Sequence, residues 1–192
     1  MQNDYCSSGC YMDKQGYDIK RLRKPIVPLS KLVRTAREVG MEIIYTRHGE
    51  ENRQSQENTT SPIGTFGWEI VQELTPMKHE PIFDKSTTSA FASSDIYNYL
   101  KSKNIKYLAF GGNTADCCVH STLRSANDLQ FQCLLLTDCC GAVNMRLHKW
   151  SIESVTIENG VFGVVTDSKS FVHSLKDHAS SFYEQYLFLS RK

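Results

Sequence analysis

Two adjacent cysteines stand where an apolar stretch gives way to a helical pattern. Residues 107–110 are continuously apolar and predict a buried strand, and a polar turn then leads to Cys117 and Cys118. A cysteine in the first turn of a helix lies near the positive end of the helix dipole, which favours the nucleophilic thiolate. A cysteine on an apolar helix face is more often a small core residue. The strand-to-helix position favours a nucleophile at Cys118, whereas Cys117 is expected to be structural.

Other polar and aromatic side chains have weaker signals. Lys85 ends a short apolar stretch, and catalytic groups gather at the carboxyl ends of parallel strands, so it can stabilise a thiolate or simply be solvated. Asp116 is expected to cap the helix that follows it, and the pair Arg47-His48 is expected to be surface charge. The loop aromatics Tyr5 and Trp68 either line a pocket or anchor their loops.

The composition excludes several classes of protein. The 192 residues suggest one domain, and a net charge of +1 argues against nucleic acid or an anionic membrane as partner. No apolar run is long enough to span a membrane. The seven cysteines include no C-x-x-C spacing, no histidine pair has i, i+4 spacing, and no phosphate loop is present, so we expect no metal and no cofactor. Free cysteines and a polar N-terminus indicate a cytoplasmic protein.

Strand and helix patterns alternate along the chain. The strands are expected over 41–46, 81–85, 107–111, 131–137 and 161–166, and the helices over 25–39, 93–103, 118–129, 144–159 and 168–175. Residues 1–24 and 47–67 are expected to be loops, and 138–142 a turn. Continuously apolar strands separated by helices predict a three-layer α/β/α fold with a doubly wound, mostly parallel sheet. The expected domain covers residues 1–175, followed by a tail over 176–192.

Four short motifs occur together in this chain: Gln2-Asn3-Asp4-Tyr5, Lys85 with Ser89-Ala90-Phe91, the segment Gly112 to Val119, and Thr137-Asp138 with Gly141-Ala142. Through these motifs the chain resembles the isochorismatase-like cysteine hydrolases. The resemblance is strongest to ureidoacrylate and biuret-type amidohydrolases, through the residues Gly9, Tyr11, Gly16, Trp68 and Glu73-Leu74-Thr75-Pro76.

The resemblance implies a triad of aspartate, lysine and cysteine, in which Lys85 and Cys118 are the last two members. It also implies a cis peptide bond between Asn113 and Thr114, with the N–H groups of Thr114 and Cys118 directed at the oxyanion. Tyr5, Trp68 and Phe91 are the expected substrate-binding residues. The implied reaction is hydrolysis of a C–N bond in a small amide, ureido or carbamoyl compound through an acyl-enzyme on cysteine. The implied assembly is a homo-oligomer.

One member of the triad has no counterpart in this sequence. The family's first strand ends in the catalytic aspartate, directly before the residue matched by Met1. That strand would lie between residues 41–46 and 107–111, so we expect two open strand edges there. A start assigned to an internal methionine and a true truncation both account for this. In the second case, the protein is expected to be a catalytically inactive binding or structural subunit.

Overall fold

The computed structural model describes residues 1–50 and 61–177. Residues 51–60 of the expected loop over 47–67, and nearly all of the expected tail over 176–192, therefore lie outside the described residues. Within them, the strands and helices alternate as the sequence predicts, and every pair of hydrogen-bonded strands is parallel.

The strands form two separate sheets. In the first, β1 (Tyr45–His48) pairs with β2 (Ile82–Lys85), and His48 lies opposite Lys85. In the second, the order is β3-β4-β5. Its strands are β3 (Tyr107–Asn113), β4 (Gln132–Gly141) and β5 (Val164–Thr166). Among the described residues no strand joins β1 to β3, so the open edges expected between residues 41–46 and 107–111 are present.

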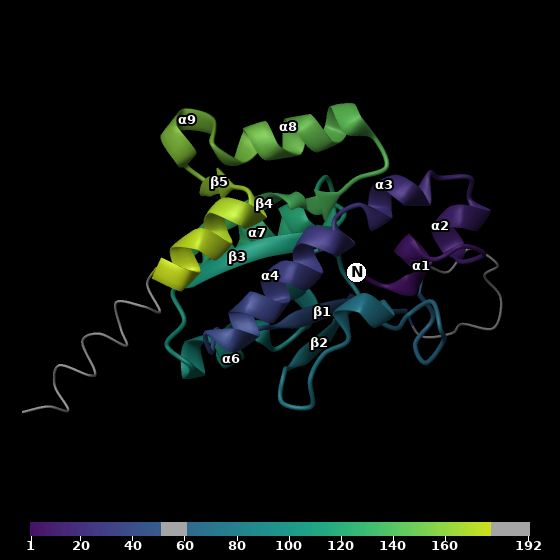
Figure 1. The fold of residues 1–192 in the computed structure, drawn as a ribbon, viewed down its shortest axis with the longest axis horizontal. Helices are drawn as coiled ribbons and strands as arrows, with labels where there is room; N and C mark the ends of the chain where they lie inside the picture. The colour runs from purple at the N-terminus through teal and green to yellow at the C-terminus, as the bar shows by residue number, and fades with distance from the viewer. Residues whose placement is uncertain (51–60, 178–192) are drawn as a thin grey trace, which may run out of the picture.

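Helices cover both faces of the larger sheet, which gives three layers (Figure 1). On one face α4 (Ile26–Glu38) and a helix over 168–177 pack through Leu29 and Phe171. On the other face α7 (Cys118–Asp128) packs through Leu123, together with α5 (Ala90–Ser93) and α6 (Ile96–Ser102). The expected doubly wound α/β fold is confirmed, with its sheet in two parts.

Three local predictions were wrong. The expected loop over 1–24 contains three short helices: α1 (Asn3–Cys6), α2 (Tyr11–Lys14) and α3 (Ile19–Arg23). The expected turn over 138–142 is largely strand, because Cys140 and Gly141 continue β4 beside β3 after a bulge. The expected helix over 144–159 is interrupted at Thr156, between α8 (Met145–Val155) and α9 (Ile157–Gly160), and Glu158 and Asn159 within α9 adopt positive φ.

The remaining boundaries follow from local hydrogen bonds. The helix expected over 93–103 is α6, which begins later, at Ile96. The separate short helix α5 precedes it, and there the Ser89 side chain accepts from the Phe91 N–H at 3.3 Å. A short 3-10 helix spans Gln72–Leu74. The strand expected over 41–46 is shifted to β1, since β2 is its only described strand neighbour.

Candidate active site

The turn between β3 and α7 presents Cys118 as the first residue of the helix. The peptide bond from Asn113 to Thr114 is cis, as the resemblance implies. The Ala115 N–H donates to the Gly141 carbonyl at 2.8 Å, and the Val119 N–H donates to the Thr114 carbonyl at 3.2 Å. Within the described residues, the N–H groups of Thr114 and Cys118 donate no backbone hydrogen bond. In the part of the chain that the structure describes, these two amide donors, one of them on Cys118 itself, therefore have no backbone acceptor.

Lys85 reaches Cys118 from the end of β2. Its Nζ atom lies 3.4 Å from the Cys118 Sγ atom and donates to the Thr87 carbonyl at 2.7 Å. Lys85 is only 5% exposed. The expectation that a strand-end lysine at this position is simply solvated is therefore wrong, because a buried ammonium requires partners and the thiol supplies one.

The surroundings of Cys118 favour its thiolate. Hydrogen bonding from the Cys117 thiol is the largest cause, and the charge of the Lys85 ammonium adds to it, so the pKa of Cys118 falls to about 5 despite the opposing effect of burial. The same contact raises the pKa of Cys117. At neutral pH one sulfur is therefore a thiolate and its neighbour is a thiol that donates to it.

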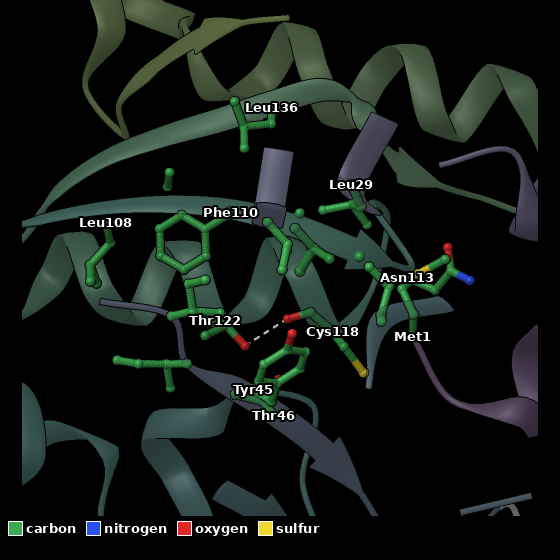
Figure 2. A pocket seen from close by; sticks show the side chains of 18 of the residues that line it. Met1, Leu29, Tyr45, Thr46, Leu108, Phe110, Asn113, Cys118, Thr122 and Leu136 are labelled. Atoms are coloured by element: carbon green, nitrogen blue, oxygen red, sulfur yellow. Dashed lines mark hydrogen bonds between the residues drawn. The ribbon is translucent and has the colours of Figure 1, made fainter. Parts of the chain in front are cut away.

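A cavity of about 250 Å³ opens beside this thiol, between the two sheets. Figure 2 shows Leu108 and Phe110 on one side and Tyr45 and Thr46 on the other, with Cys118 at one end. The walls are mostly apolar and come from β1, β3, α4 and α7. An apolar cavity with a few polar groups at one end is the usual form of a small-molecule site.

The structure brings most of the predicted site residues together. Tyr5 and Phe91 line this cavity with Lys85 and Cys118. Burial and the nearby Cys118 thiolate raise the pKa of Tyr5, so its hydroxyl stays protonated. Phe91 also packs on Phe131, with ring centroids 5.8 Å apart.

Trp68 lies elsewhere. It is absent from the residues that line the cavity, and the Arg47 guanidinium stacks on its ring at 3.3 Å from the centroid. Its carbonyl accepts a hydrogen bond from the Gln2 side chain at 2.8 Å. Trp68 therefore holds the segment around residue 68 against the N-terminal residues, which corresponds to the loop-anchoring alternative.

Two sequence expectations about charged residues were wrong. Asp116 does not cap α7: the helix has no side-chain cap, and the Asp116 Oδ1 atom is buried without a hydrogen-bond partner among the described residues. His48 is not a surface charge, because its side chain is 15% exposed and lines the cavity. The signal that could have identified His48 is its place at the carboxyl end of a strand, the same signal that singled out Lys85.

Only the family resemblance, and no local pattern, pointed to Gln2. Its side chain donates to the His48 carbonyl at 2.7 Å and accepts from the His48 N–H at 2.8 Å. This pair of bonds fixes the end of β1 beside Lys85, so Gln2 positions the wall of the cavity. Only the folded chain brings positions 2 and 48 together.

The Asp4 carboxylate is held by hydrogen bonds from backbone N–H groups. Its carboxylate accepts from the Ser61 N–H at 2.6 Å and from the Tyr11 N–H at 3.2 Å, and the residue is 7% exposed. Its side chain also lies so close to Gly67 that a Cβ there would overlap it. Asp4 therefore joins three segments of the chain, and its hydrogen bonds do not include Cys118.

The described residues contain no group of three or more His, Cys, Asp or Glu side chains arranged to hold a metal ion. No described helix is both long and apolar enough to cross a membrane. The chemical groups of this site are therefore the thiolate, an ammonium, free amide N–H groups and an apolar cavity.

Lys85 at the end of β2 and Cys118 at the start of α7 thus meet at one cavity between parallel sheets. A family model, the isochorismatase domain, matches residues 1–170. The chain belongs to the isochorismatase family of hydrolases.

Individual relatives agree with this assignment. The ureidoacrylate amidohydrolase RutB of Klebsiella pneumoniae (strain 342) is 30% identical over 203 residues, which cover 91% of this chain and 84% of the relative. Two solved structures share the fold. An isochorismatase-like hydrolase from Alkaliphilus metalliredigens has a TM-score of 0.81 and 20% identity, covering 91% of this chain and 93% of that one. A cysteine hydrolase from Pseudomonas syringae pv. phaseolicola 1448A has a TM-score of 0.81 and 18% identity, covering 92% and 89%.

Proposed function

We propose that this chain is a cysteine-dependent hydrolase of C–N bonds in a small amide, ureido or carbamoyl compound. The observation that carries the proposal is the contact of 3.4 Å between Lys85 Nζ and Cys118 Sγ at the end of an apolar cavity. The ureidoacrylate amidohydrolase activity named for the 30% identical relative supports the class of substrate.

The first half of the reaction is acyl transfer to sulfur. The Cys118 thiolate attacks the substrate carbonyl, and the unengaged N–H groups of Thr114 and Cys118 receive the negative charge that develops on its oxygen. The leaving nitrogen takes a proton from water, ammonia or an amine departs, and the acyl group remains on sulfur as a thioester or a thiocarbamate. Lys85 contributes by favouring the thiolate before the attack.

The second half of the reaction requires a water molecule and a base. The resemblance assigns this base to an aspartate before the residue matched by Met1. Asp4 does not replace it, because its carboxylate is engaged by the N–H groups of Ser61 and Tyr11. Separate measurements of acylation and of turnover therefore distinguish the two halves of the reaction.

The test is release of ammonia from a panel of amides, ureas and carbamoyl compounds, with the 192-residue chain and its Cys118→Ala variant. Both proteins are first shown to be folded by circular dichroism. The expected result is release that requires Cys118. A burst of one equivalent without further turnover would show acylation alone. Mass spectrometry of a proteolytic digest would then find the acyl group on the peptide that contains Cys118.

Two results would overturn the proposal. Release that survives in Cys118→Ala would mean that another group carries the chemistry. The second result is the absence of both a burst and turnover with every compound, from a folded chain whose Cys118 alkylates rapidly. That result would favour the alternative of a binding or structural subunit.

A further inference from the structure

The chain contains two pairs of adjacent cysteines in different environments. Cys117 is exposed and Cys118 is half-buried at the mouth of the cavity. Cys139 and Cys140 lie inside β4 and are 0% and 3% exposed. A solute can therefore reach the first pair, whereas the second is enclosed by the core.

The first pair occupies consecutive positions at the start of α7, and Lys85 Nζ lies 3.4 Å from the Cys118 sulfur. Consecutive Cα atoms are about 3.8 Å apart, shorter than the usual separation of about 4.4–6.8 Å across a disulfide. A disulfide between neighbours is therefore strained, and strained disulfides are the ones that reductants open easily.

We propose that Cys117 is the resolving thiol in a reversible oxidation of Cys118 by hydrogen peroxide. In the first step the Cys118 sulfur bonds to one peroxide oxygen while the O–O bond breaks and hydroxide leaves. The sulfur is oxidised by two electrons to a sulfenic acid, and the peroxide is reduced. In the second step Cys117 loses its proton, its sulfur bonds to the Cys118 sulfur, the S–O bond breaks, and the hydroxyl leaves with a proton from the solvent as water.

The charges around the pair support this order of events. While Cys118 is a thiolate, its negative charge and its hydrogen bond keep Cys117 protonated. Oxidation makes Cys118 uncharged, which removes that effect. The Lys85 ammonium, which lowers the pKa of Cys117, then favours the Cys117 thiolate that attacks. The first oxidation therefore activates the second sulfur.

This inference rests on the proposed function, since it assigns a regulation to the same nucleophile. A disulfide between the two residues blocks Cys118, and a dithiol reductant restores it by releasing both thiols. The resolving thiol also intercepts the sulfenic acid before further peroxide converts it into an irreversible sulfinic acid. Cys117, which we expected to be structural, thus gains a chemical role.

The sequence offers a direct measurement. Trypsin cuts after Lys106 and Arg124, and the peptide 107–124 contains Cys117 and Cys118 as its only cysteines. The folded 192-residue chain is treated with hydrogen peroxide, alkylated under denaturing conditions and digested. We expect peptide 107–124 to be two hydrogen atoms lighter and unalkylated. Peptide 125–146 contains the buried pair and is the internal control, expected to carry an alkyl group on each of its three cysteines.

The matched variant is Cys117→Ser, which keeps a hydrogen-bond donor beside Cys118 and removes the second sulfur. We expect its Cys118 to proceed to sulfinic acid, two oxygen atoms heavier, and to resist dithiothreitol, whereas the wild-type peptide recovers both thiols. Equal accumulation of sulfinic acid in the two proteins, or a disulfide from Cys118 to another cysteine, would overturn the inference. Because mass is measured, the inference can hold even if no amide is hydrolysed, and the two proposals fail separately.

Discussion

Lys85 Nζ and Cys118 Sγ are 3.4 Å apart, although the two residues are separated by 33 positions and follow strands of different sheets. Lys85 closes β2 in the two-stranded sheet, and Cys118 follows β3 of the three-stranded sheet. The contact is thus made across the interruption between the two sheets.

The first prediction concerns the titration of this thiol. A lowered pKa means that the thiolate is present above it, so alkylation of Cys118 by iodoacetamide should rise with pH through about 5 and then level off. Lys85→Met removes the ammonium and should move the midpoint upward by about one pH unit or more. The measurement is the alkylated fraction of Cys118 in peptide 107–124. An unchanged midpoint in Lys85→Met would show that the lysine charge does not act on the thiol.

The second prediction separates Asp4 from the chemistry. Asp4→Ala leaves the buried N–H of Ser61 and the N–H of Tyr11 without an acceptor, so the free energy of unfolding should fall by about 1–3 kcal/mol in urea titrations. Asp128→Ala, on an exposed turn of α7, is the control and should change it by less than about 0.5 kcal/mol. Lost turnover with unchanged stability in Asp4→Ala would instead make Asp4 the base.

The third prediction concerns pH and the ion pair of Arg37 with Glu80. Arg37 donates two hydrogen bonds of 2.8 Å to the Glu80 carboxylate, whose side chain is 3% exposed, and this lowers the pKa of Glu80 below 4.5. The ionised form is therefore favoured by folding, so its stabilisation is present above pH 4.5 and is lost as the pH falls through the lowered value. Glu80→Gln should cost about 1–3 kcal/mol at neutral pH and less in acid.

Urea titrations across this pH range test the ion pair, with Asp84→Asn as the control. Asp84 pairs with Arg47 in the same way, but its side chain is 44% exposed, so its loss should cost less than about 1 kcal/mol. Equal losses for Glu80→Gln at neutral and acidic pH would contradict the assignment of the pH dependence to this carboxylate.

The fourth prediction uses the packing around Asn113. A Cβ at Gly141 would overlap the Asn113 side chain, whose Nδ2 atom donates to the Leu22 carbonyl at 3.0 Å. Gly141→Ala should therefore destabilise the chain by about 1–3 kcal/mol. In an Asn113→Ala background the overlap is absent, so the same substitution should cost less, and a double-mutant cycle in urea measures the difference. Strictly additive losses would exclude this contact as the cause.

The alternation of strands and helices was predictable because it depends on local apolar periodicity. The ends of the elements were less predictable. The composition of residues 41–44 predicts a strand, yet β1 begins at Tyr45, where β2 supplies a neighbour. The sequence predicts a turn from Cys139 to Gly141, yet these residues continue β4 because β3 lies beside them. In both places, pairing with a distant segment decided the conformation.

The part of the site that could be predicted has local sequence signals. For Cys118 the signal is a helix start, and for Lys85 it is a strand end. The role of His48 as a cavity wall depends on Gln2, which holds it from 46 positions away. Trp68 was a candidate pocket residue because it is an aromatic residue in a predicted loop, but its ring stacks on the Arg47 guanidinium. Tertiary contacts of this kind leave no periodicity in the sequence.

The cavity of about 250 Å³ lies between the two sheets, so its width follows their separation. A change in this width also changes the distance between the end of β2, which carries Lys85, and the start of α7, which carries Cys118. Because the charge of Lys85 lowers the pKa of Cys118, the reactivity of one sulfur atom depends on how far apart the two sheets stand.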